Sequence, residues 1–139
     1  MNIISHKIRI KPRRSQYEKL ARCAGTARFV YNWGLANWKK QYESGDKPNC
    51  NKLKRQLTQL KKTDLGWLKD VPQAIASNAM NNLGIAYKRF FKTKKGFPKF
   101  KKRGCRESFT PVDHRLRVDS KDKKIRIRGL GVMLSLIHI

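Results

Sequence analysis

The chain has 139 residues, with 34 Lys or Arg against 9 Asp or Glu, and its formal net charge at pH 7 is +25. This length suits about one domain with a modest core, and this charge repels itself in a compact fold unless a polyanion balances it. Nucleic acid is therefore the expected partner, rather than a small-molecule substrate. We expect no membrane and a cytoplasmic location, because no segment reaches the roughly 18 continuous apolar residues of a spanning helix and the first residues lack a signal peptide's apolar core.

The first predicted element is a strand at residues 3–11, with the sequence IISHKIRIK. Apolar and polar side chains alternate there, as in a half-buried strand, and Pro12 ends it. His6 falls on the buried side, where an imidazole is more often a hydrogen-bonded core residue than a catalytic one.

A long helical pattern follows over residues 13–42, with apolar side chains at three- and four-residue steps. Gly25 interrupts it. One interpretation is a helix-turn-helix with its turn at residues 23–26 and its second helix at 27–40. The other is a continuous helix that tolerates the glycine at a cost of about 1 kcal/mol. We favour the break, because a second apolar row follows it: Phe29, Val30 and Trp33.

A turn-rich linker at residues 43–50 separates this pattern from the next helix. Asn51 is expected to cap that helix, which turns inward Leu53, Leu57 and Leu60. In the short turn at residues 63–70, we expect Trp67 and Leu68 to fill the core.

Pro72 suits the first position of a further helix. Helical spacing predicts that this helix buries Ile75, Ala76, Ala79, Met80, Leu83, Ala86, Tyr87 and Phe90. Its other side carries a row of uncharged polar residues: Gln73, Ser77, Asn78, Asn81 and Asn82. Amides can donate and accept at base edges, so this row, like Arg28 and Asn32, could face nucleic acid. Plain surface exposure explains these residues equally well.

The stretch Tyr87–Arg103, YKRFFKTKKGFPKFKKR, holds nine Lys or Arg, five aromatic residues and no acid. Cations spaced for phosphates, interleaved with rings that pack or stack on bases, are what single-stranded or A-form nucleic acid requires. The alternative is a helix end followed by a solvated basic loop. We expect phosphate contacts from Lys88, Arg89, Lys92, Lys94, Lys95, Lys99, Lys101, Lys102 and Arg103.

Strand patterns return after Gly96 and Pro98. A short strand is predicted at residues 107–112, and a β-hairpin at 114–128 with its turn at 119–123. One face of the hairpin is apolar, and the other extends the basic surface through Arg115, Arg117, Arg126 and Arg128. The predicted fold class is α+β, with a helical lobe inserted between pieces of one β-domain, or alternatively two separate domains.

The sequence contains no recognisable catalytic constellation. Its acids fall mostly in turns or beside basic residues, and neither GxxxxGK nor GxGxxG occurs. Cys23, Cys50 and Cys105 are odd in number and far apart, which indicates reduced thiols rather than disulfides or a zinc site. The residues taken alone describe a chain that binds without catalysing and without a cofactor.

Six short motifs run in order along nearly the whole chain: the strand ending at Pro12, ARFVYNW at 27–33, WLKDVP at 67–72, AYKRFF at 86–91, GFPKFKK at 96–102 and ESFT at 107–110. Together they resemble the N-terminal part of the TnpB (OrfB) proteins of IS200/IS605-type insertion-sequence transposons, which are relatives of the type V CRISPR nucleases. ARFVYNW together with GFPKFKK is the most specific part of the match.

The resemblance implies an RNA-guided DNA endonuclease that aids the spread of its transposon. In that family an N-terminal strand and later strands build a β-barrel, and a helical recognition lobe, often described as a helix-turn-helix, is inserted between them. Both lobes hold guide RNA and double-stranded target DNA, and sequence choice passes to base pairing. Matching positions would read a short motif beside the target with Lys54, Gln73, Ser77 and Thr110. Cys50 and Ala74 stand where relatives can carry larger or aromatic residues.

The resemblance also implies a domain layout. Residues 1–12 would be the first strand of a wedge-like barrel domain, 13–95 the helical recognition domain, and 96–133 the truncated continuation of the barrel. Catalytic carboxylates with two Mg²⁺ in a RuvC-like nuclease domain, and a zinc ribbon, would lie downstream. This portion would then hold no catalytic residue and no metal ligand.

Residues 134–139, LSLIHI, depart from the family pattern. The transposon end CTGTCTCTTATACACATC, used in sequencing libraries, encodes LSLIHI in frame, so we expect an adapter-derived tail; a native apolar strand is the alternative. The leading hypothesis is a nucleic-acid-binding fragment of an RNA-guided nuclease. A stand-alone helix-turn-helix regulator and a structural ribonucleoprotein component remain as rivals.

Overall fold

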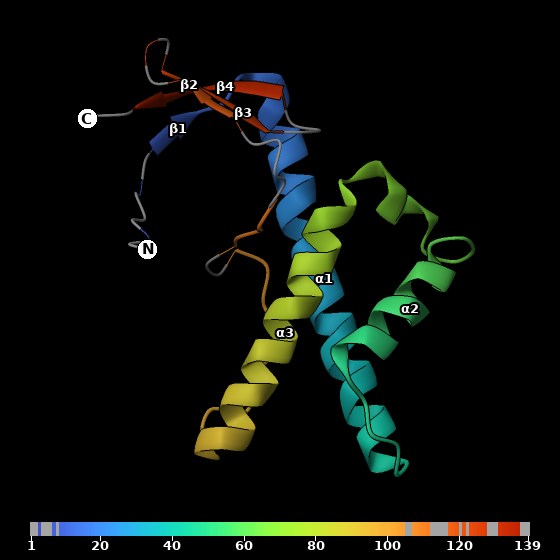
Figure 1. Cartoon of the computed structure of the whole chain (residues 1–139). Coiled ribbons are helices and arrows are strands. Elements are labelled where there is room, and N and C mark those ends of the chain that lie inside the picture. The colour runs from blue at the N-terminus through green and yellow to red at the C-terminus, as the bar shows by residue number, and fades with distance from the viewer. Residues whose placement is uncertain are drawn as a thin grey trace. The chain divides into compact units, whose positions relative to one another are not determined.

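The computed structural model describes residues 3, 7, 9–104, 107–111, 117–119, 121, 123–127 and 131–136, without the side chains of 70, 117–119, 127 and 134–136 (Figure 1). The chain divides into two compact units, one made of Met1–Ala21 with Asp113–Ile139 and the other of Arg22–Val112. A four-stranded sheet lies in the first unit and the helices α2 and α3 lie in the second. The predicted mixture of helices and strands is confirmed.

The sheet of the first unit has the strand order β1-β4-β3-β2, with each neighbouring pair antiparallel. Its strands are β1 (Arg9–Lys11), β2 (Arg117–Asp119), β3 (Lys124–Ile127) and β4 (Gly131–Leu136). Ile125 of β3 pairs with Met133 of β4, and both side chains are buried. Apolar cross-strand pairs stabilise a sheet, so this pair forms the described core of the unit.

The predicted hairpin is confirmed, because β2 and β3 pair with Val118 opposite Ile125. Strand β1 is the end of the predicted first strand, while residues 4–6 and 8, His6 among them, lie outside the described residues. Residues 134–136 pair with β1 as part of β4. The origin of this tail segment and the closure of the sheet into a barrel stay predictions.

The predicted strand at 107–112 is wrong over residues 107–111, which form no regular element; residue 112 lies outside the described residues. The segment instead satisfies its polar groups through side chains of helices. The carbonyl of Thr110 accepts a hydrogen bond from Asn78 Nδ2 at 2.8 Å, and the carboxylate of Glu107 pairs with Arg28.

Helix α1 (Arg14–Glu43) is capped by Gln16, which also contacts the sheet of the first unit. Its Oε1 accepts a hydrogen bond from Arg13 N at 2.7 Å, the reach-back contact of a capping box, and its Nε2 donates to Val132 O at 2.9 Å. Gly131 precedes that carbonyl with φ of +84°, a conformation that only glycine adopts freely. Gln16 therefore joins the first turn of α1 to β4.

Helix α1 continues through Gly25, so the predicted break at residues 23–26 is wrong. A bend is unnecessary because neighbouring segments cover the second apolar row: Val30 is fully buried, and the ring of Phe29 meets Trp67 edge-on at 5.0 Å between centroids. The rival hypothesis of a stand-alone regulator loses the turn on which it was built.

The close approach in α1 occurs at Gly34 rather than at Gly25. A Cβ at Gly34 would lie 2.7 Å from Leu83 Cδ2 and 2.9 Å from Met80 Sδ, both on α3 (Gln73–Thr93), whereas a Cβ at Gly25 would meet only Arg28 Nη2, at 3.7 Å. Gly34 therefore leaves room for the side chains of Leu83 and Met80 against α1.

Helix α2 (Cys50–Leu60) is capped by Asn49, two residues before the predicted Asn51. Asn49 has the extended backbone that a cap requires, and its Oδ1 accepts a hydrogen bond from Lys52 N at 2.9 Å. The predicted inward side chains Leu53 and Leu57 are buried. Leu60 is half-buried at the helix end.

The short helix η1 (Gly66–Asp70) follows, and Leu68 is buried there as predicted. Trp67 remains 45% exposed, so its prediction as a core residue is wrong. Pro72 takes the cap position of α3 instead of its first turn. Six of the eight residues predicted to be buried on α3 are buried, and Ala86 and Phe90 are half-buried.

Candidate nucleic-acid interface

The nine cations from Lys88 to Arg103, here called the basic segment, are all exposed. Three of them lie on the last turns of α3, and Lys94 ends the helix in the left-handed conformation with φ of 54°. The others follow in the irregular stretch 95–103. A row of solvent-facing cations can meet successive phosphates.

Two side chains of α1 fix the backbone of the basic segment. Asn32 Oδ1 accepts a hydrogen bond from Lys101 N at 2.7 Å, and Asn32 Nδ2 donates to Lys101 O at 2.9 Å. Arg28 pairs with Glu107 just beyond the segment. The sequence alone allowed Arg28 and Asn32 to face nucleic acid. In the structure both side chains instead contact the chain in and just after the basic segment.

A cluster of rings supports the start of the segment from inside. Tyr87 is buried and stacks on Trp38 of α1, with 4.1 Å between ring centroids and an interplanar angle of 12°. Phe97 meets Tyr87 and Phe90 edge-on at 5.7 and 5.0 Å. Such pairs contribute about 0.5–1.5 kcal/mol each beyond their buried area, so the cluster holds the chain as it leaves α3.

Cations also lie over rings along the segment. Lys101 Nζ lies 4.5 Å from the centroid of Tyr31, and Lys39 Nζ lies 5.0 and 5.1 Å from those of Phe97 and Phe100. Phe91 and Phe100 are 57% and 50% exposed, whereas Tyr87 is 3% exposed. The rings available for stacking on bases are therefore the phenylalanines and not the tyrosine.

The arginine face of the hairpin is only partly described. Arg126 on β3 is exposed, and Arg117 pairs with it across β2 and β3. Arg115 and Arg128 lie outside the described residues.

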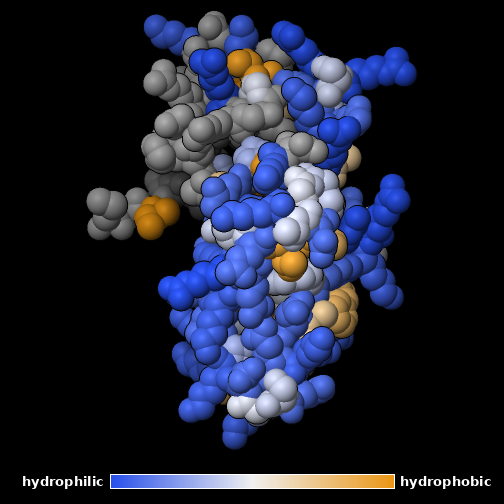
Figure 2. Space-filling view, turned by 90° about the vertical axis from the view of Figure 1, so that its right-hand side faces the viewer, coloured by the Kyte–Doolittle hydropathy of each residue, from blue (hydrophilic) through white to orange (hydrophobic). Residues whose placement is uncertain are grey.

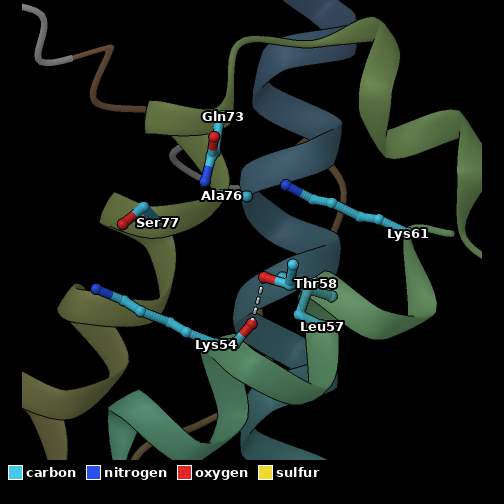
Figure 3. Close-up of a pocket in the computed structure, with 7 residues that line it drawn as sticks. All are labelled: Lys54, Leu57, Thr58, Lys61, Gln73, Ala76 and Ser77. Carbon is cyan, nitrogen blue, oxygen red and sulfur yellow. Dashed lines mark hydrogen bonds between the residues drawn. The ribbon is translucent and has the colours of Figure 1, made fainter.

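A small pocket between α2 and α3 brings together three of the four residues predicted to read the flanking motif (Figure 3). Lys54 extends from α2 toward α3, where Gln73 and Ser77 stand one turn apart. Lys54 Nζ also donates to Asn81 Oδ1 at 2.6 Å. Thr110, the fourth residue, is held by its carbonyl to Asn78, the neighbour of Ser77.

Sequence reasoning missed two further residues of this pocket, Thr58 and Lys61. Thr58 Oγ1 donates to Lys54 O at 2.9 Å, and Lys61 reaches toward Ala76 (Figure 3). Burial lowers the pKa of Lys61. Their spacing from Lys54 could have predicted this, because residues at i, i+3, i+4 and i+7 lie on one face of a helix.

Charged and polar side chains cover most of the face over α2, with only small apolar patches between them (Figure 2). Two cysteines are free thiols, with Cys23 buried and Cys50 half-buried; Cys105 lies outside the described residues. Within the described ranges, no helix is long and apolar enough to cross a membrane. No three His, Cys, Asp or Glu side chains gather there as a metal site.

A mixed α and β chain with an exposed basic segment has the features of a nucleic-acid-binding protein. Residues 1–47 match the family model HTH_OrfB_IS605, described as a helix-turn-helix domain; in this structure the described part of that stretch holds β1 and the continuous helix α1. Over 129 residues the chain is 33% identical to a protein of Escherichia coli strain K12 named "Putative RNA-guided DNA endonuclease InsQ".

These two matches show that the chain is similar to OrfB (TnpB) proteins of insertion sequences. The match to the Escherichia coli protein covers 91% of this chain and 32% of that protein. The chain thus spans about a third of the length of the curated relative that it matches.

Proposed function

We propose that this chain is the nucleic-acid-binding part of an RNA-guided DNA endonuclease, and that it holds guide RNA and double-stranded target DNA along the basic segment. The observation that carries the proposal is a row of nine exposed cations on a backbone that Asn32 and the ring cluster hold in place. A protein that leaves sequence choice to base pairing needs mainly such a basic channel and a few base contacts.

The pocket between α2 and α3 would supply those base contacts. Lys54, Gln73 and Ser77 offer a cation, an amide and a hydroxyl at one place, and these groups recognise base edges. Thr110 would contribute beside them. This pocket is our candidate for reading the motif that flanks the target.

The remaining assignments follow from the family. The sheet would belong to a barrel domain whose arginine face, Arg115, Arg117, Arg126 and Arg128, extends the RNA-binding surface. The helices would form the recognition domain. A RuvC-like domain with two Mg²⁺ and a zinc ribbon would complete the protein, which would act in the cytoplasm.

Salt dependence of affinity tests the proposal. Binding of the full chain to a labelled single-stranded RNA and to duplex DNA is followed by fluorescence anisotropy between low and high salt. If six to nine cations contact phosphates, the plot of log affinity against log salt has a slope of about −4 to −6 for the RNA. An affinity that does not change with salt would refute the proposal.

Matched variants separate the basic segment from net charge. Replacing Lys99, Lys101 and Lys102 by Gln should flatten the slope by about two units, at about 0.7 per lost phosphate contact. Replacing the exposed Lys40, Lys47 and Lys69 by Gln removes the same charge and should leave the slope nearly unchanged. RNA binding with no response to any DNA motif would favour the structural ribonucleoprotein component instead.

A further inference from the structure

A second cavity lies between the C-terminal half of α1, the start of α2 and the middle of α3, and no role assigned above uses it. Its volume is ≈ 520 Å³, which is in the range of about 300–1,000 Å³ that small-ligand sites occupy.

The walls of this cavity are flat and largely apolar. Trp38 and Tyr87, stacked on each other, form one part, and Ile85 and Phe91 of α3 form another. Ile85 and Phe91 are 54% and 57% exposed. Apolar side chains that line a hollow and remain uncovered can gain by packing against a planar ligand.

The rim of the cavity is polar and basic. It carries Asn49, Asn51, Asn81 and Lys88, with no acidic side chain among the lining residues. In Asn49 and Asn81, Oδ1 already accepts hydrogen bonds, from Lys52 N and Lys54 Nζ. Their amide nitrogens are therefore the groups left to donate to the edge of a ligand.

Tyr87 contributes its ring to the cavity and not its hydroxyl. The side chain is 3% exposed, and its hydroxyl has almost no accessible surface and no hydrogen-bond partner among the residues that the structure describes. The polar groups that a ligand can reach are therefore those of the rim, where the exposed Lys88 favours an anion.

We infer that this cavity takes one unstacked base of a single-stranded nucleic acid, with the base against Phe91 and Ile85, its edge at the asparagines, and its phosphate on Lys88. A planar ring with donors and acceptors on its edge and an attached anion matches the walls, the rim and the charge together. The inference rests on the proposed function and adds a defined base site to its phosphate contacts.

The test compares strands that have the same phosphates but different bases. Affinities of the full chain are measured for an eight-nucleotide single-stranded RNA and for the same backbone built only from abasic units, and a DNA pair distinguishes the two possible sources of the base. The base-bearing strand should bind about fivefold or more tightly.

Substitutions then assign that preference to the cavity. Phe91→Ala, at an exposed ring of the wall, should reduce the preference for bases while leaving the salt slope unchanged. Ile85→Trp, which fills the hollow from an exposed position, should reduce it as well. Tyr42→Ala, at an exposed aromatic residue that does not line the cavity, is the matched control and should change nothing.

An unchanged preference in both Phe91→Ala and Ile85→Trp overturns the inference. So does self-association of the chain that Ile85→Trp abolishes, because a second copy would then occupy the cavity. If both strands bind with a steep salt slope but without a cavity-dependent preference, only the base site fails. If neither strand binds, the proposed function fails as well.

Discussion

Replacing Asn32 by Ala tests whether α1 holds the basic segment in place. The side chain makes two hydrogen bonds to the backbone of Lys101, at 2.7 and 2.9 Å. Each is worth about 0.5–1.5 kcal/mol net, and both are exposed to solvent. We therefore expect the lower part of that range, about 1–2 kcal/mol in total, which makes local opening of the segment about 5- to 30-fold more frequent.

Hydrogen exchange at the Lys101 amide reports this opening directly, since that N–H is the donor to Asn32. Its protection should fall by about 5- to 30-fold, and RNA affinity should fall by no more than the same factor, because only the ordered fraction of the segment binds. Asn37→Ala is the control, as the amide of Asn37 donates to Trp33 O of its own helix at 2.8 Å. Unchanged exchange at Lys101 in the Asn32 variant would refute this role.

Three further predictions concern the fold, Tyr87 and the pocket. In thermal unfolding, Gly25→Ala should stabilise the chain by about 0.5–1 kcal/mol. Gly34→Ala should destabilise it by about 1–3 kcal/mol. Destabilisation by Gly25→Ala would contradict a continuous α1. Burial, with Tyr31 as a smaller cause, raises the pKa of Tyr87 from 10.0 to about 12. The neutral phenol is favoured in the folded state, so the free energy of unfolding should fall as the pH rises from about 10 towards 12, and Tyr87→Phe should lack this decline in denaturant titrations. Gln73→Ala should weaken discrimination between base pairs in the flanking motif by about 1–3 kcal/mol. Selection from a library of duplex DNA would then return a broader motif. Gln59→Ala, on the exposed side of α2, should leave the motif unchanged.

The sequence predicts best where one periodicity dominates. On α3 the three- and four-residue spacing identifies Ile75, Met80 and Leu83, which are all fully buried. In the hairpin, the two-residue alternation places Val118 opposite Ile125. In both cases a single packed face decides the structure, and the pattern of apolar residues records that face.

The sequence-based predictions fail where contacts between segments far apart in the chain determine the local structure. A glycine in a helical pattern does not reveal whether a second apolar row is buried by a bend or by a neighbouring segment; here Trp67 covers Phe29. The pairing of Asn32 with Lys101 joins residues 69 positions apart, and no local pattern encodes it. That the Tyr87 hydroxyl has no hydrogen-bond partner among the described residues is likewise visible only in three dimensions, because the spacing of Tyr87 indicates nothing more than a buried aromatic residue.

The most direct test of the central claim is a map of where RNA touches the chain. A single-stranded RNA carrying 4-thiouridine is bound to the full chain and irradiated, and the cross-linked residues are identified by mass spectrometry. We predict adducts concentrated within residues 87–103, including the exposed rings of Phe91 and Phe100, and fewer of them when Lys99, Lys101 and Lys102 are replaced by Gln. Adducts spread evenly over the basic residues of the chain, or absent from 87–103, would contradict an interface built on the basic segment.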